Sequence, residues 1–205
     1  MPHSTRVVSL IAVAPMALLL FAPGGVVSQA HPTSVAPEEI RHIQSISPQS
    51  GPPGTVVSLS TMNLPYEANV HVGVGAMGQG FEALVEAQQG RLGEIAVRVS
   101  VPEDTPQDRP IVFIAFNAIF APIGMSDPFH VTDAEGKVRR RGEVVSREDD
   151  CVLFRDQDGY EYELTGENDG LQVGEALRVE GFFFNTGPCF DGPTIGVSDA
   201  RPNEE

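Results

Sequence analysis

The chain contains no tryptophan, only two cysteines and few basic residues. Among its 205 residues, 13 lysines and arginines stand against 28 aspartates and glutamates, and the formal net charge is −15 at pH 7. Both halves are acidic, with ten acids against four bases in residues 31–132 and eighteen against eight in residues 133–205. A field of this sign repels nucleic acid and anionic membrane surfaces. We therefore expect no nucleic-acid partner.

Long apolar runs are also scarce. One follows Arg6 and covers residues 7–21, broken only by Ser9 and Pro15. It is shorter than the ~20 residues of a comfortable membrane span, and Ser28-Gln29-Ala30 places small residues where a signal peptidase reads them. The sequence predicts a signal peptide over residues 1–30, a flexible leader over 31–40, and an exported protein, periplasmic or extracellular, without membrane insertion after cleavage. An uncleaved N-terminal anchor is the alternative.

The two cysteines, Cys151 and Cys189, both lie in the second half. In an exported protein an even pair is typical of a disulfide, whereas two cysteines are too few for a structural zinc site. We expect a Cys151–Cys189 bridge.

Residues 41–132 show the period-two alternation of strands, organised around residues 46–59, where a Pro- and Gly-rich turn separates two strands. Val70, Val72 and Val74 share one strand face, and residues 111–116 are apolar on both faces. About seven short strands joined by turn residues are typical of an immunoglobulin-like sandwich.

These residues also carry a family resemblance. Ile46-Ser47-Pro48, Ser50-Gly51, Gly54-Thr55-Val56-Val57 and Val72-Gly73-Val74-Gly75 resemble the signature of IPT/TIG domains, with a departure at Ser60-Thr61-Met62. The resemblance covers residues 41–132. It implies an immunoglobulin-like module with an interaction or spacer role and carries no catalytic residues.

Residues 137–200 read as a second domain, followed by an acidic tail at 201–205. Asp158-Gly159 lies between two alternating segments, which indicates a hairpin. Five expected strands, the last over residues 194–197, favour a small OB-like β-barrel. The segment resembles disulfide-pinned barrel domains of exported bacterial proteins, few of which have an assigned activity. The predicted fold class is thus all-β, a sandwich followed by a barrel.

No catalytic constellation is visible, and we expect no enzyme activity, cofactor or metal. The Gly73-x-Gly-x-x-Gly78 match lacks room for the helix that receives a pyrophosphate. Asp156 and Asp158 could begin a calcium site but lack the remaining ligands of an EF-hand loop, so a turn is the preferred interpretation. Arg139-Arg140-Arg141 is interpreted as a solvated strand edge, and His71 and His130 as exposed strand histidines.

Two apolar features point to a contact surface. A turn-rich segment carries Ile119 and Phe120, which either cover the core or form an exposed contact. Phe182 and Phe184 form an aromatic patch unless a bulge at Gly181 turns them inward.

The predicted function is a non-enzymatic binding or scaffolding protein that contacts a protein or an extracellular polymer through these four residues. A small-ligand or carbohydrate module using a barrel face at Tyr160 and Tyr162 is the alternative, and an enzyme with an unfamiliar acidic site is the third.

Overall fold

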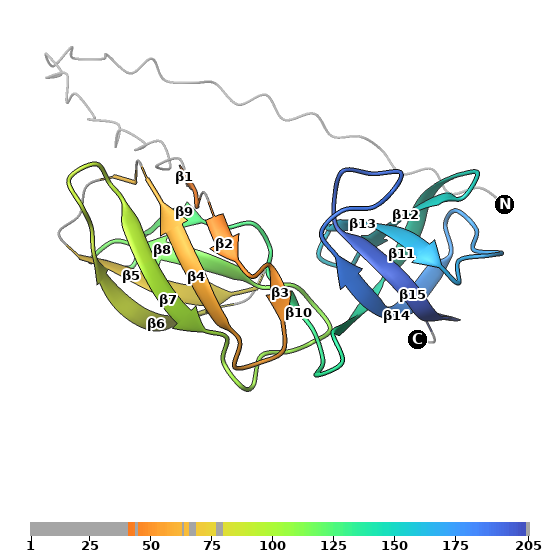
Figure 1. Cartoon of the computed structure of the whole chain (residues 1–205), viewed down its shortest axis with the longest axis horizontal. Coiled ribbons are helices and arrows are strands. Elements are labelled where there is room, and N and C mark those ends of the chain that lie inside the picture. Colours follow the sequence, from red (N-terminus) through yellow and green to blue (C-terminus); the bar gives the residue numbers. More distant parts are fainter. Residues whose placement is uncertain (1–40, 44, 63, 66–68, 77–79, 204–205) are drawn as a thin grey trace, which may run out of the picture. The chain divides into compact units, whose positions relative to one another are not determined.

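The computed structural model describes residues 41–203, apart from residues 44, 63, 66–68 and 77–79. The predicted signal peptide and leader lie outside these residues, as do part of the Gly-x-Gly-x-x-Gly match and the last two residues of the expected tail. Every regular element described is a β-strand, which confirms the all-β prediction (Figure 1). The described residues belong to one compact unit. The described part of the chain has no helix long and apolar enough to cross a membrane.

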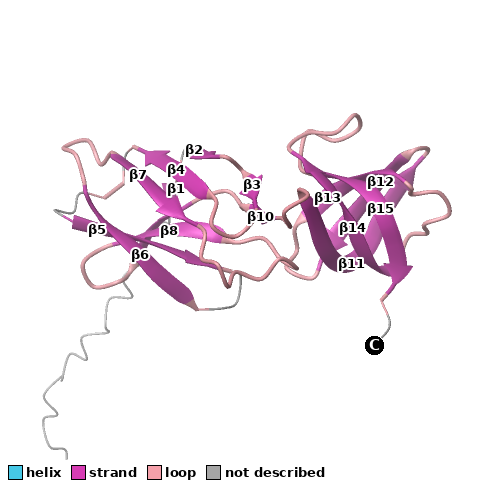
Figure 2. Cartoon of the chain, turned by 60° about the horizontal axis from the view of Figure 1, so that its bottom comes forward, coloured by secondary structure: helices cyan, strands magenta, loops and turns pink. Residues whose placement is uncertain are grey.

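The first ten strands, which we call the sandwich, form three sheets. The larger sheet has the order β1-β9-β8-β5-β6, a second has the order β2-β4-β7, and β3 pairs with β10 (Figure 2). The strands are β1 (Arg41–His42), β2 (Ser45–Ser47), β3 (Ser50–Gly51), β4 (Val56–Thr61), β5 (Asn69–Gly75), β6 (Phe81–Gln88), β7 (Ile95–Ser100), β8 (Val112–Phe116), β9 (Pro122–Met125) and β10 (His130–Val131). Layered sheets of this kind are consistent with an immunoglobulin-like sandwich.

Period-two alternation explains the sandwich core. Val70, Val72 and Val74 of β5 are all buried on one face of their strand. Phe113 and Phe129 meet them in the same apolar cluster and contact one another edge to face, with ring centroids 6.0 Å apart. Burial of each such side chain contributes about 1.5–3 kcal/mol. The Pro-rich turn is built by Thr55, which donates its backbone N–H to the Pro52 carbonyl at 3.1 Å, with Gly54 at φ 81°.

The last five strands form a closed barrel in the order β11-β12-β13-β15-β14, with β14 pairing back to β11. They are β11 (Lys137–Glu148), β12 (Cys151–Asp156), β13 (Glu161–Gly166), β14 (Ala176–Phe184) and β15 (Thr194–Pro202). A closed five-stranded barrel is the architecture expected of an OB-like domain. The expected end of the last strand was wrong, because β15 continues to Pro202 through its antiparallel pairing with β14, so residues 201 and 202 belong to a strand.

The predicted disulfide is confirmed. Cys151 at the start of β12 and Cys189 in the β14–β15 loop have Cα atoms 5.9 Å apart. Beside them the buried carboxylate of Glu163 accepts backbone N–H bonds from Cys189 at 3.2 Å and from Phe190 at 2.9 Å. Bridge and carboxylate together hold this loop against the barrel.

Candidate functional site

The β8–β9 loop is an ordered turn that exposes apolar side chains. Asn117 donates its N–H to the Ala121 carbonyl, and its side-chain oxygen accepts the N–H groups of Ile119 at 3.1 Å and Ala121 at 2.9 Å. Ile119 is 83% exposed and Phe120 is 46% exposed. The tip of this segment is therefore exposed, as the contact-surface interpretation expects. Ile123, further along the same segment, is buried in the core.

Phe120 has a backbone conformation that is unusual for a bulky residue. Its φ is 58°, in the left-handed region, which favours glycine. Such a conformation costs about 1–3 kcal/mol and persists only where the surroundings hold it. Here its N–H donates to the Asn117 carbonyl at 2.9 Å, and its ring stacks on His71 with centroids 4.5 Å apart. The strained turn places the Phe120 ring on the outer surface of the larger sheet.

A second stack continues this surface. Phe81 of β6, 45% exposed, stacks on the buried ring of Phe116 with centroids 4.0 Å apart. Phe120 lies 6.3 Å from Phe81 and 6.4 Å from Phe116 between ring centroids. We call this group the aromatic face; its members are His71, Phe81, Phe116, Ile119 and Phe120.

Glycine makes room for these rings. A side chain at Gly73 would meet the Glu82 carbonyl and would place its Cβ 3.2 Å from a ring carbon of Phe116. Gly75 likewise pairs with Phe81, and its Cβ would lie 3.4 Å from the Phe81 Cβ. The first two glycines of the rejected dinucleotide pattern therefore lie where aromatic rings cross a strand.

The aromatic face has a stability consequence that is testable directly. Phe120→Gly loses the stack on His71 but relieves the left-handed backbone, and the two effects are each about 1 kcal/mol. We expect the free energy of unfolding in urea to change by less than about 1 kcal/mol. A loss of several kcal/mol would show that the ring holds the fold rather than facing a partner.

Phe182 and Phe184 are exposed, at 44% and 52%. The register of β14 against β15 does shift between Glu180 and Gly181, yet both rings stay outside. Lys137 Nζ lies 5.4 Å from the centre of the Phe182 ring. Phe183 points the other way and stacks on His130 at 4.0 Å. The irregularity therefore does not turn the two rings inward.

The predicted ligand face is wrong at Tyr162, one of its two residues. Tyr162 is 0% exposed in the barrel core, and Tyr160 packs partly against the same core. Alternation explains the error, because Tyr162 shares its strand face with Leu164, whose side chain is also buried. No ligand could reach the Tyr162 ring without opening the barrel.

Tyr162 belongs to a buried polar cluster. Its hydroxyl lies 3.3 Å from Asp156 Oδ2 and 3.4 Å from His130 Nδ1, and it accepts the Arg140 Nε–H at 3.2 Å. Burial raises the pKa of Asp156 despite two backbone N–H bonds from Tyr160 and Asp158 and despite the nearby Arg140. It also raises the Tyr162 pKa, and the cluster is closed to solvent. We assign it to stability because its side chains are buried, although Arg140 and His130 each line part of an open surface hollow.

His130, predicted to be exposed, is buried, and its pKa is lowered to about 3 by burial first and by Arg140 second. Below pH 6.5 the unfolded chain binds a proton at His130 that the folded protein does not bind. The free energy of unfolding therefore decreases as the pH is lowered. We expect about 2 kcal/mol to be lost between pH 7 and pH 5 on this account. Asp156 has the opposite effect: its pKa is raised in the folded protein, so its protonation favours the folded state as the pH is lowered.

Urea unfolding at both pH values checks this prediction. His130→Phe keeps an aromatic ring against Phe183 and leaves Asp156 in place, so its comparison with the natural protein isolates the histidine. An equal loss of stability in both proteins would contradict the burial of a neutral His130.

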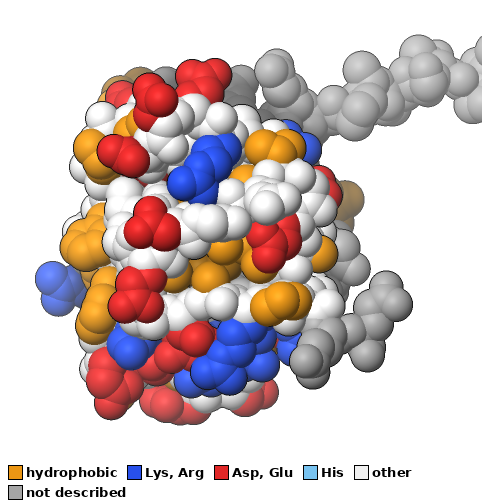
Figure 3. Space-filling view, turned by 90° about the vertical axis from the view of Figure 1, so that its right-hand side faces the viewer, with side chains coloured by type: hydrophobic (Ala, Val, Ile, Leu, Met, Phe, Trp, Pro, Cys, Tyr) orange, Lys and Arg blue, Asp and Glu red, His pale blue; other side chains and the backbone are white. Residues whose placement is uncertain are grey.

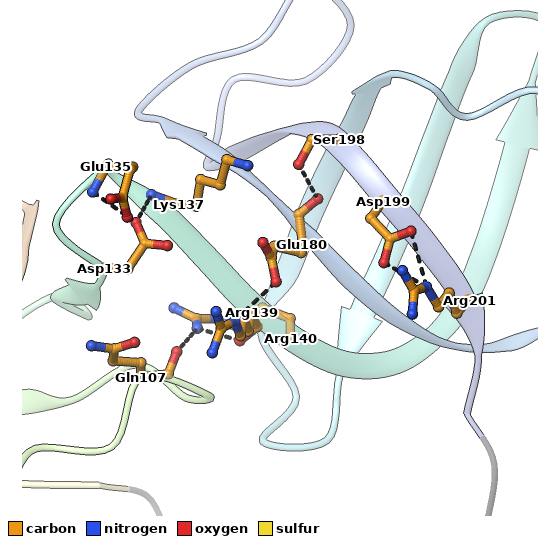
Figure 4. A network of polar contacts seen from close by, with 10 residues as sticks. All are labelled: Gln107, Asp133, Glu135, Lys137, Arg139, Arg140, Glu180, Ser198, Asp199 and Arg201. Atoms are coloured by element: carbon orange, nitrogen blue, oxygen red, sulfur yellow. Dashed lines mark hydrogen bonds and ion pairs between the residues drawn. The ribbon is translucent and has the colours of Figure 1, made fainter.

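The arginine run does not lie wholly on a solvated edge. Arg139 pairs with Glu180 at 2.9 Å, whereas Arg140 is fully buried and donates to the carbonyls of Gln107 and Arg139 (Figure 4). Only Arg141 is an exposed strand residue. Figure 3 shows a face on which basic side chains are interrupted by acidic ones. The hollow that Arg139, Arg141 and Arg178 line is also lined by Glu103, Asp104 and Asp108, so acidic side chains interrupt the basic ones there too.

The calcium hypothesis needs free carboxylate oxygens at the Asp156–Asp158 turn, but one oxygen of Asp156 already accepts hydrogen bonds within that turn. Its Oδ1 accepts N–H groups from Asp158 at 3.0 Å and Tyr160 at 2.8 Å, and the side chain is buried. Within the described residues no group of three His, Cys, Asp or Glu side chains is arranged to hold a metal ion. Calcium binding at this turn remains testable by isothermal titration, in which no heat at millimolar calcium would exclude it.

Sequence reasoning identified Ile119 and Phe120 but missed Phe81, Phe116 and His71 as their neighbours. The missed signal was cross-strand: His71 pairs with Phe116, and Gly75 pairs with Phe81, which only the register reveals. Comparison of the chain with protein-family models and with curated proteins found no match.

Proposed function

We propose that this is an exported, non-enzymatic binding or scaffolding protein that contacts a protein or an extracellular polymer through its aromatic face. The observation that carries the proposal is the exposed Phe120 ring, held in a strained backbone conformation and stacked on His71. Strained residues cluster at functional sites because the fold must compensate for their cost. Aromatic residues, phenylalanine among them, are also enriched in the buried cores of protein interfaces.

The architecture supports the same proposal. The resemblance to IPT/TIG domains would give the sandwich an interaction role, and the net charge of −15 favours cationic partners. The Cys151–Cys189 bridge is compatible with an oxidising compartment outside the cytoplasm. Phe182 and Phe184 supply a second exposed aromatic pair on the barrel.

Partner capture tests the proposal. Residues 31–205 are immobilised and exposed to extracytoplasmic extract, beside an Ile119→Ser plus Phe120→Gly variant and a Val173→Ser control. Val173 is an exposed apolar residue of a barrel loop, so the control removes apolar surface elsewhere. We expect the double variant to lose at least about tenfold of the retained partner, since interface aromatics typically contribute 2 kcal/mol or more. Equal retention by all three proteins would contradict the proposal.

A further inference from the structure

Strand β6 ends the larger sheet with one side unpaired. It pairs with β5 through residues 81–88, and no strand among the described residues pairs with its other edge (Figures 1 and 2). Phe81, Glu82 and Ala83 are all exposed at its start. A strand of this kind presents unpaired backbone N–H and C=O groups, which other extended chains can bind.

The aromatic face begins at this same strand. Phe81 is the first residue of β6, and its ring stacks on Phe116 two strands further into the sheet. A chain added beside β6 would place alternate side chains on each face of the sheet. Every second side chain would therefore lie on the side of Phe81, where apolar groups extend the aromatic surface.

Charge restricts which chain fits. Glu82 and Glu86 are both exposed on β6, on opposite faces of the sheet because they pair with Val74 and His71, and both contribute to an acidic protein. Carboxylates on an edge strand disfavour pairing with a second copy of the same acidic chain, and they attract basic side chains. The predicted leader at residues 31–40 has no lysine or arginine and carries Glu38 and Glu39, so it also matches poorly.

We propose that β6 is the site at which an extended basic peptide segment of a partner protein adds a strand to the larger sheet, with its alternate apolar side chains against the aromatic face. This rests on the proposed function and specifies its partner class as protein. Backbone hydrogen bonds supply affinity in this mode, and the side-chain pockets supply specificity.

The probe is a fluorescein-labelled peptide, Lys-Val-Lys-Phe-Lys-Val-Lys-Phe, measured by fluorescence anisotropy with residues 31–205. A second peptide of the same sequence carries N-methyl groups on alternate amides, which removes backbone donors while leaving the side chains. We expect the methylated peptide to bind about tenfold more weakly. Hydrogen exchange should slow in the β6 amides when the unmodified peptide binds.

Two protein variants test whether the peptide is attracted by the β6 carboxylates or by the overall negative charge of the protein. Glu82→Gln plus Glu86→Gln should weaken binding about tenfold, whereas Glu148→Gln plus Glu167→Gln, which removes two exposed carboxylates from the barrel, should not. The Ile119→Ser plus Phe120→Gly variant reports on the aromatic face separately.

The outcomes distinguish this inference from the proposed function. Equal binding of both peptides, or no binding of either, overturns strand addition at β6. In either case, loss of partner capture in the Ile119→Ser plus Phe120→Gly variant would still support the aromatic face as a contact surface. A dimer in sedimentation, or protection without peptide of those β6 amides that point away from β5, would assign the strand's free edge to a second copy or to another segment of this chain and would overturn the inference.

Discussion

Reduction of the Cys151–Cys189 disulfide is expected to lower the free energy of unfolding by about 4 kcal/mol. The two cysteines are 38 residues apart in the sequence, so the bridge removes a large loop from the unfolded ensemble. It also joins the start of β12 to a loop that Glu163 holds as well, through its carboxylate and through its backbone N–H, which donates to the Pro193 carbonyl at 3.0 Å. Most of the loss should therefore appear as earlier unfolding of the barrel.

Urea denaturation of the Cys151→Ala plus Cys189→Ala protein, followed by circular dichroism, measures this effect. The double substitution avoids a reductant and leaves no free thiol. Glu163→Gln in the same background should cost further stability, because a neutral amide oxygen accepts weaker hydrogen bonds than a carboxylate does. An unchanged midpoint in the cysteine-free protein would show that the loop is held without the bridge.

Substitution of Arg140 is the other change with a large expected effect. Arg140→Met should lower the free energy of unfolding by about 3 kcal/mol, the size found when one partner of a buried charged group is removed. The guanidinium is fully buried and donates to the Tyr162 hydroxyl at 3.2 Å and to the Gln107 carbonyl at 3.0 Å. It also stabilises the Asp156 carboxylate, whose pKa burial raises.

A second substitution shows whether charge is the cause. Arg140→Met plus Asp156→Asn removes both buried charges, and we expect it to recover part of the stability that Arg140→Met alone loses. Thermal unfolding of the natural protein, Arg140→Met, Asp156→Asn and the double variant at pH 7 measures the recovery. If the double variant is as unstable as the sum of the two single variants, the two groups act independently and the proposed cluster is wrong.

The fold was predictable in strands where apolar residues alternate with polar or small ones, because the alternation alone shows which side chains are buried. Val70, Val72 and Val74 alternate with polar or small residues, and the strand from residue 176 to 184 was expected with the bounds that the structure shows. Asp158-Gly159 predicted the turn in which Gly159 has φ 89°. These features depend on neighbours in the sequence.

The errors concern residues whose surroundings come from distant strands. Arg140 was predicted to lie on a solvated strand edge, yet it is buried, where Tyr162 and Gln107 accept hydrogen bonds from its Nε and Nη1 groups and Nη2 has no hydrogen-bond partner within the described residues. Tyr162 looked exposed as an aromatic residue among acids, but its barrel position turns it inward. Only Ile119 and Phe120 of the aromatic face were predicted. Phe81 and Phe116 were missed because the pairing of their strands, which brings the two rings together, is not visible in the sequence.

Photo-crosslinking in intact source cells tests whether the aromatic face contacts a partner. A photoreactive phenylalanine analogue replaces Ile119, which is 83% exposed on the aromatic face, and in a control replaces Val173, which is exposed on a barrel loop. If the aromatic face contacts a partner, position 119 gives a discrete cross-linked product with one protein or one polymer. We expect this product to be absent when the analogue is at position 173. The same pattern of products from both positions, or none from position 119, would contradict a contact role for the aromatic face.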